Sequence, residues 1–238
     1  MSKKKENFWI PYADLMTVLM VIFLFISLAY MGLVQYQKKK QDKIFEEYKQ
    51  TKENLYYELK ETFKNDLQKW NLELDTDLSI KFTNPSVLFQ SGSAEITSVF
   101  QSILTVFFPK YLNVIMQDKY KDKIAEIRIE GHTDDVPIHR TNDPYIDNIQ
   151  LSQDRSRNVL AFLRGLSCYQ TLGESKVQLL QFWLTANGLS YGRTLDSNKQ
   201  PTFLSKNPID KEKSRRVEFR IVTTSEILVQ KVIEQLEI

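Results

Sequence analysis

The feature that most constrains this chain is an apolar run without a charged residue from Leu15 to Val34. A helix of about 20 residues is roughly 30 Å long, which matches the hydrocarbon core of a bilayer. A secretory signal has a shorter apolar core and a small-residue cleavage site, whereas this run ends in polar residues and then three lysines at 38–40. The sequence therefore predicts a transmembrane helix at residues 10–34, after a short tail at 1–9, and we expect the chain to stay anchored.

Asp14 is the only acidic residue in the predicted span, and it stands three positions after Pro11, a residue suited to the first turn of a helix. A carboxylate is costly in a membrane and is often functional there, where it can take up and release a cation. An acid at the start of a helix also interacts favourably with the helix dipole and can reach headgroup water. The residue alone leaves both interpretations open.

The segment from 35 to 75 is rich in Lys, Glu and Gln and contains no Gly or Pro. Its apolar residues recur at helical spacing, namely Ile44, Tyr48, Leu55, Leu59, Phe63, Leu67 and Trp70. One narrow apolar stripe cannot bury itself alone, so the pattern favours a helical linker that pairs with a second copy in a coiled coil. A solvated charged linker is the alternative.

Beyond residue 75, short strand-like runs alternate with helical ones. Strands are expected at 78–82, 87–90, 127–130 and 216–222, and helices at 94–117, 151–163, 177–186 and 225–236. Interleaved strands and helices predict an α/β fold for residues 76–238, an α+β sandwich in which helices cover a sheet.

The remaining composition argues against several classes of protein. The net charge is only +2 and no basic face stands out, so no nucleic-acid partner is expected, and Cys168 alone cannot form an intramolecular disulfide. The two histidines and nearby acids, His132, Asp134, Asp135 and His139, match no zinc-site spacing. With no phosphate-binding or nucleophile motif either, the sequence favours a protein that is not an enzyme and has no catalytic residues, metal site or other cofactor.

Two parts of the chain contain strings that resemble a known family. The run from Pro11 to Met20, Pro-Tyr-Ala-Asp-Leu-Met-Thr-Val-Leu-Met, resembles the transmembrane helix of MotB-type stator B subunits. The strings at 129–138 (Ile-Glu-Gly-His-Thr-Asp-Asp-Val-Pro-Ile), 148–157 (Asn-Ile-Gln-Leu-Ser-Gln-Asp-Arg-Ser-Arg) and 215–221 (Arg-Arg-Val-Glu-Phe-Arg-Ile) resemble the OmpA/MotB peptidoglycan-binding domain.

This resemblance implies a topology and a set of partners. It implies a single-pass protein of the inner membrane with its N-terminus in the cytoplasm and its C-terminal domain in the periplasm, although the lysines at 38–40 and 43 by themselves favour the reverse orientation. It further implies that Asp14 carries H⁺ or Na⁺, and that a homodimer sits inside a ring of multi-span subunits similar to MotA or ZorA and binds peptidoglycan.

The resemblance also implies roles for four residues of the domain. Arg155 would bind the carboxylate of diaminopimelate in a peptidoglycan stem peptide, Asp134 its ammonium group, and Asn148 the peptide backbone, while Leu151 packs beneath. Without the resemblance, Asp134 capping a turn and pairing with Arg155 would be the simpler interpretation. Family members often carry an aromatic residue where this chain has Asp147, which leaves the affinity for peptidoglycan open.

The short N-terminal tail and the charged segment directly after the span are most similar to the B subunits of Zorya anti-phage systems. The resemblance therefore implies an ion-driven stator in phage defence. A flagellar MotB-type subunit and a static peptidoglycan anchor without ion flow are the alternatives.

Overall fold

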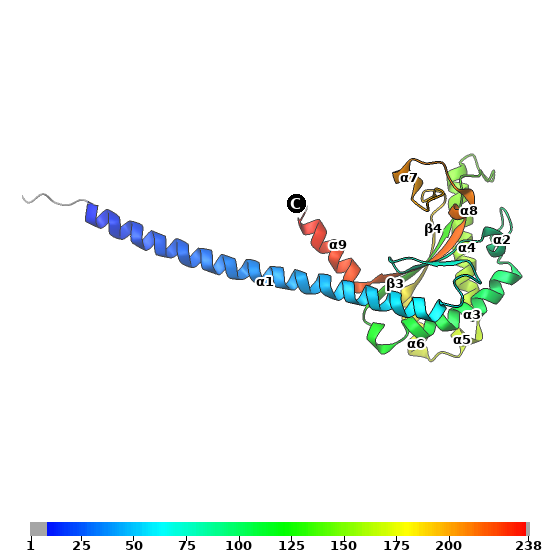
Figure 1. The fold of residues 1–238 in the computed structure, drawn as a ribbon, viewed down its shortest axis with the longest axis horizontal. Coiled ribbons are helices and arrows are strands. Elements are labelled where there is room, and N and C mark those ends of the chain that lie inside the picture. The colour runs from blue at the N-terminus through cyan, green and yellow to red at the C-terminus, as the bar shows by residue number, and fades with distance from the viewer. Residues whose placement is uncertain (1–8, 237–238) are drawn as a thin grey trace, which may run out of the picture. The chain divides into compact units, whose positions relative to one another are not determined.

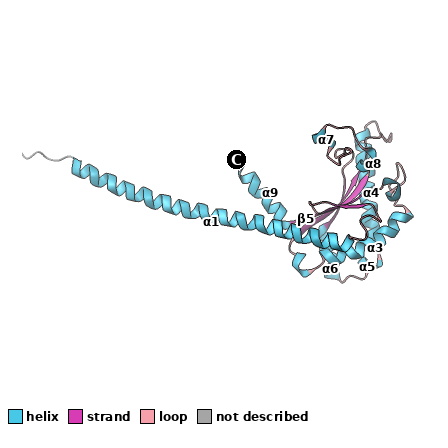
Figure 2. Ribbon diagram, in the orientation of Figure 1, coloured by secondary structure: helices cyan, strands magenta, loops and turns pink. Residues whose placement is uncertain are grey.

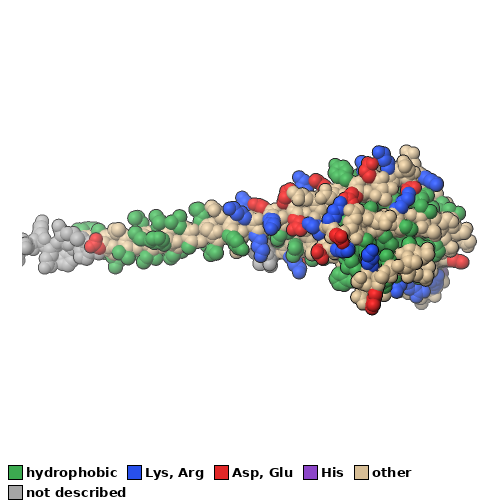
Figure 3. Space-filling model, turned by 90° about the horizontal axis from the view of Figure 1, so that it is seen from below, with side chains coloured by type: hydrophobic (Ala, Val, Ile, Leu, Met, Phe, Trp, Pro, Cys, Tyr) green, Lys and Arg blue, Asp and Glu red, His purple; other side chains and the backbone are tan. Residues whose placement is uncertain are grey.

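The apolar run lies in helix α1 (Trp9–Phe63) of the computed structural model, which describes residues 9–236 (Figure 1). The predicted tail at 1–9 therefore falls outside the described residues except for Trp9. Among the described residues, α1 is the one helix long and apolar enough to span a membrane. Side chains from 12 to 34 are all exposed, and hydrophobic ones cover this part of α1 in the space-filling view (Figure 3). Such an all-round apolar surface is stable only in an apolar medium.

The chain divides into a first compact unit that ends at Glu47 and a second that begins at Tyr48. The predicted boundary at residue 76 thus lies 28 residues (76 minus 48) inside the second unit. The second unit begins this early because the apolar stripe of α1 belongs to it: Leu55, Leu59 and Phe63 are fully buried in the core of their own domain. From Leu55 onward this stripe is not available for a coiled coil with a second copy.

The second unit is an α+β sandwich built on one five-stranded sheet, as the sequence predicts (Figure 2). The sheet order is β1-β2-β5-β3-β4, with β3 and β4 parallel and the other neighbours antiparallel. Its strands are β1 (Leu72–Leu74), β2 (Ser79–Phe82), β3 (Ile124–His132), β4 (Leu184–Gly188) and β5 (Arg216–Thr223). Its remaining helices are α2 (Pro85–Leu88), α3 (Ser98–Ile115), the 3₁₀ turn η1 (Asp118–Tyr120), α4 (Pro144–Gly165), α5 (Ser167–Gln170), α6 (Glu174–Trp183), α7 (Thr202–Ser205), α8 (Lys211–Ser214) and α9 (Thr224–Leu236).

Alternation along the central strand β5 gives the sheet one apolar and one polar face. Phe219 belongs to the apolar face and contacts Phe82 of β2 and Phe107 of α3, with ring centroids 5.8 and 5.1 Å apart. On the other face, Glu218 lies in register with Glu130 of β3. Helices therefore cover the apolar face, and charged side chains meet on the opposite one.

Two predicted elements differ in type from the structure, and the helix expected at 151–163 begins earlier, at Pro144. The stretch 87–90 was expected to be extended, but Pro85 begins the short helix α2, and only Phe89 makes a strand-like bridge, to Ile96. The helix expected at 177–186 ends at Trp183, and the next five residues form β4. Parallel pairing of β4 with the buried strand β3 outweighs the helical pattern there.

Helix α4 lies unusually close to the end of β3. A Cβ atom added to Gly131 would lie 2.3 Å from the backbone oxygen of Ser152, so only glycine allows this approach. A Cβ on Gly188 of β4 would lie 2.4 Å from the amide nitrogen of Gln153. These two glycines fix the position of α4 on the sheet, and α4 carries three of the predicted site residues.

Candidate functional site

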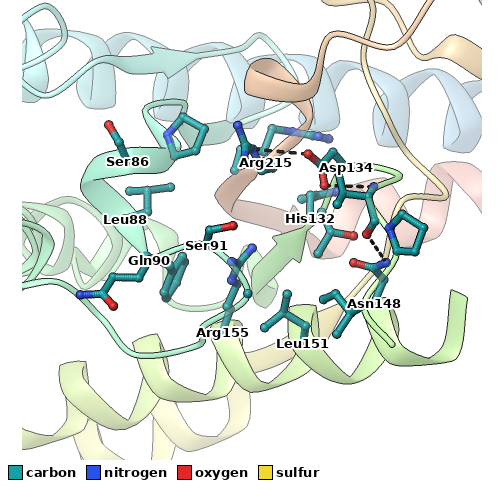
Figure 4. A pocket seen from close by; sticks show the side chains of 18 residues that line it. Ser86, Leu88, Gln90, Ser91, His132, Asp134, Asn148, Leu151, Arg155 and Arg215 are labelled. Atoms are coloured by element: carbon teal, nitrogen blue, oxygen red, sulfur yellow. Dashed lines mark hydrogen bonds and ion pairs between the residues drawn. The ribbon is translucent and has the colours of Figure 1, made fainter. Parts of the chain in front are cut away.

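A pocket of about 670 Å³ opens beside the C-terminal end of β3 (Figure 4). Its walls come from α2 and the segment 89–92, the loop 133–138, the N-terminal half of α4 and the start of β5. The four residues predicted from the sequence, Asp134, Asn148, Leu151 and Arg155, all line it. The structure thus brings together residues that are up to 21 positions apart in the sequence (155 minus 134).

Three of these residues share one face of α4. Asn148, Leu151 and Arg155 follow one another at spacings of three and four, which places them in a row along a helix. The helix begins with Asp143 as N-cap, whose carboxylate accepts a 2.9 Å hydrogen bond from the Tyr145 amide, and with Pro144 at its first position. The sequence therefore sets both where α4 starts and which side faces the pocket.

Asp134 follows the end of β3 and is almost fully buried. Its Oδ1 accepts a 3.4 Å hydrogen bond from the Val136 amide. Its Oδ2 has no hydrogen-bond partner among the described residues and lies 3.6 Å from Nε of Arg215. A buried carboxylate oxygen in this state is a strong acceptor for a cationic group of a ligand.

Arg155 enters the pocket from the opposite wall (Figure 4). Its Nε donates a 2.9 Å hydrogen bond to the Ser93 carbonyl, and its guanidinium carbon lies 4.9 Å from the centroid of the Phe89 ring. These contacts hold the side chain, while its two terminal NH₂ groups keep their donors free of any described partner. Burial lowers the pKa of Arg155 to about 10, and the Asp134 carboxylate opposes this shift. The guanidinium therefore stays charged at neutral pH and presents two parallel donors.

Asn148 and Asp147 hold the loop that closes one side of the pocket. Asn148 Nδ2 donates 3.1 Å hydrogen bonds to the carbonyls of Val136 and Pro144. Asp147 accepts hydrogen bonds from the backbone amides of Arg140 and Thr141, and the Thr141 amide is the main cause that keeps the pKa of Asp147 below its ordinary value. The residue that departs from the family pattern therefore anchors the loop, and it does not line the pocket.

Arg215 is a pocket residue that the sequence analysis did not assign. It directly precedes β5 and approaches Asp134 through space. The signal was present in the string Arg-Arg-Val-Glu at 215–218, but spacing alone does not tell which of two adjacent arginines faces a ligand. In the structure, Arg216 donates hydrogen bonds to Glu218 and to the carbonyls of Arg193 and Ser214.

Behind the pocket, Glu130, His132 and Glu218 form a buried cluster on the polar face of the sheet. His132 Nε2 lies 3.6 Å from Glu130 and 3.5 Å from Glu218. Burial, with Arg216 as the next cause, lowers the pKa of His132 to about 3, so the ring is neutral. Arg216 pairs directly with Glu218, and we assign no metal to this cluster.

Comparison with known proteins identifies the family. The Zorya protein ZorB of Escherichia coli strain Crooks is 35% identical to this chain over 98% of the chain and 96% of the relative. This chain belongs to the ZorB family. A second ZorB, from Escherichia coli O139:H28, is 28% identical over 92% of this chain and 82% of the relative. No family model matches the sequence.

Among solved structures, the ZorB-family chain is similar to a MotB-like protein from Desulfovibrio vulgaris. The two are 22% identical with a TM-score of 0.48, and the match covers 73% of this chain and 95% of that one.

The remaining predicted residue of this ZorB-family chain, Asp14, lies in the first compact unit, apart from the pocket residues of the second. Its side chain is exposed on α1, one helical turn from Thr17, whose hydroxyl donates a 2.8 Å hydrogen bond to the Ala13 carbonyl. The carboxylate is therefore accessible on the surface of the predicted span.

Proposed function

We propose that this chain is the peptidoglycan-anchored B subunit of an ion-driven motor of the Zorya type. The observation that carries the anchoring role is the pocket in which the Asp134 carboxylate and the Arg155 guanidinium line one cavity. Membership in the ZorB family and an acid on an apolar helix support the motor role. The chain binds and positions in this proposal, and it catalyses no reaction.

The proposed ligand is the diaminopimelate residue of a stem peptide, which ends in an ammonium and a carboxylate on the same carbon. The ammonium would donate to the unbonded Oδ2 of Asp134. The carboxylate would take the two free NH₂ groups of Arg155 in a bidentate pair. Leu151 supports the aliphatic part of the ligand, and Oδ1 of Asn148, which has no donor among the described residues, accepts from the peptide backbone.

At the membrane end, the proposal assigns Asp14 to the binding and release of H⁺ or Na⁺. Two copies of the chain would lie inside a ring of multi-span A subunits, with the N-terminus in the cytoplasm and the second unit in the periplasm of an inner membrane. Peptidoglycan holds this dimer still, and ion flow past Asp14 turns the ring. A domain boundary at Tyr48 is part of the same proposal, with residues 48–238 as the peptidoglycan-binding part.

The anchoring role is tested by sedimentation of the full-length protein, in mild detergent, with purified peptidoglycan sacculi. We expect Asp134→Asn and Arg155→Met each to weaken binding at least tenfold, about the effect of losing one charge-assisted contact. Asp135→Asn is the matched control, because Asp135 is an exposed neighbour that pairs with Lys211 at 3.7 Å. Undiminished binding by both pocket variants would show that this pocket is not the anchor.

The motor role is tested in cells that carry the intact system, with phage plating as the readout. Asp14→Asn should abolish protection while the protein still co-purifies with a multi-span subunit in excess over it. The control is Asp42→Asn, which removes an exposed acid of the same helix beyond the span. Full protection with Asp14→Asn would favour a static anchor, and a deletion that affects swimming instead of plating would favour a flagellar subunit.

A further inference from the structure

The charges in the pocket do not balance, and the imbalance concerns Arg215. The pocket contains one carboxylate, from Asp134, and three guanidinium groups, from Arg155, Arg215 and Arg216. Arg216 is compensated by Glu218 at 2.5 Å. Among the residues that line the cavity, Arg155 and Arg215 therefore share the single charge of Asp134, while the Glu130 carboxylate lies behind the cavity beside the neutral His132.

Arg215 is held only loosely by its partner. Its Nε lies 3.6 Å from Asp134 Oδ2, beyond hydrogen-bond distance, and has no hydrogen-bond partner among the described residues although the atom is buried. About a third of the whole side chain is exposed. A buried donor without an acceptor is costly, so this nitrogen favours the arrival of an anionic group.

We propose that Arg215 binds a second carboxylate of the ligand, so that the site selects stem peptides with two free carboxylates besides the ammonium group. This inference rests on the proposed function and names the ligand chemistry of the same site. When the ligand ammonium binds Asp134, Arg215 loses its counter-charge and becomes available to the second carboxylate. One ammonium and two carboxylates neutralise Asp134, Arg155 and Arg215 together.

A stem peptide offers this second carboxylate from two sources. One is the α-carboxylate of diaminopimelate, which is free when the peptide ends at that residue and becomes an amide when D-alanine follows. The other is the α-carboxylate of the preceding D-glutamate, which is lost when that residue is amidated to D-isoglutamine. A cavity of about 670 Å³ is in the range that accommodates a ligand larger than a single amino-acid end group.

The test is a titration of the full-length protein in detergent with four synthetic peptides. The reference is the tripeptide L-Ala-γ-D-Glu-meso-diaminopimelate. The second carries an added D-alanine whose own carboxylate is amidated, the third has D-isoglutamine, and the fourth replaces diaminopimelate with L-lysine. We expect the wild type to lose about tenfold in affinity with either the second or the third peptide, whichever lacks the carboxylate that Arg215 binds.

The variant Arg215→Gln should bind the reference tripeptide about tenfold more weakly and should no longer distinguish it from the peptide that lacks this carboxylate. Lys211→Gln removes a nearby exposed cation that does not line the pocket and should leave all four affinities unchanged. The thermal unfolding midpoint of both variants establishes that each is folded.

The outcomes separate the two proposals. If Arg215→Gln binds all peptides as the wild type does, or if the wild type binds the first three equally, the second-carboxylate inference is wrong while diaminopimelate recognition stands. If the lysine peptide binds as tightly as the reference, or if no peptide binds, the proposed ligand is wrong and this inference fails with it.

Discussion

A fragment that begins at residue 76 should not fold, whereas one that begins at Tyr48 should. The shorter fragment lacks five buried side chains, those of Leu55, Leu59, Phe63, Trp70 and Leu72. Burial of one large apolar side chain stabilises a fold by about 1.5–3 kcal/mol, so their removal costs about 8–15 kcal/mol. Because a whole domain is stable by only about 5–15 kcal/mol, this loss is enough to unfold it.

The assay is urea unfolding of fragments 48–238 and 76–238, followed by circular dichroism. We expect a cooperative transition for the longer fragment and none for the shorter one. A graded version is Leu59→Ala in the longer fragment, with an expected loss of about 2–5 kcal/mol, against Leu204→Ala at an exposed position of α7 as the control. A cooperative transition of 76–238 within about 2 kcal/mol of the longer fragment would refute the assignment of these residues to the core.

Three further predictions concern the site. Gly131→Ala should destabilise the domain by about 1–3 kcal/mol, because the added Cβ would clash with the Ser152 backbone of α4. Gly165→Ala is the control, because a Cβ there has no atom within 4 Å, and equal urea midpoints for the two variants would contradict the packing argument. The folded state holds the pKa of His132 at about 3, below its unfolded value of 6.5. His132 therefore costs no stability above pH 6.5 and up to about 2 kcal/mol between pH 6.5 and 5, where the unfolded state binds a proton that the folded state does not. The variant His132→Gln should flatten this part of the profile of unfolding free energy against pH, and an unchanged slope would show that another group causes it. Asp147→Ala should weaken sacculus binding, because the amides of Arg140 and Thr141 lose their acceptor and the loop loosens; binding equal to wild type would show that the loop does not shape the site.

Much of the fold follows from local sequence patterns. The strand expected at Ile127–Glu130 and the last strand and helix appear in the structure close to their expected positions, because each has an unambiguous periodicity. The helix expected at Leu151–Leu163 is present as well, but it begins seven residues earlier (151 minus 144), at Pro144. The helical pattern after Trp183 predicts the wrong element, since β4 depends on pairing with β3, a strand more than 50 positions earlier. Local patterns do not contain that information.

The same limit applies to the boundary of the domain. The stripe through Leu55, Leu59 and Phe63 is equally suitable for a second copy of the helix and for the core of its own domain. Spacing shows that one face must be covered but does not identify the partner. In the structure the partner is α3, where the Phe107 ring stacks on Phe63 at 4.9 Å.

The site was predictable to the extent that its residues stand in recognisable strings. Asp134, Asn148, Leu151 and Arg155 line one pocket as expected, while their roles toward a ligand stay predictions. Arg215 could not be separated from its neighbour by sequence, because only the backbone direction at the start of β5 decides which arginine approaches Asp134.

The position of β5 has a consequence for how the protein is made. It is the last strand of the described residues, yet it lies in the middle of the sheet, between β2 and β3. Until residues 216–223 have been synthesised and have paired as β5, the strands β1 and β2 have no hydrogen-bonded connection to β3 and β4. Arg215 and Arg216 arrive at the same moment, so a chain cut short before β5 has neither a closed sheet nor a complete pocket.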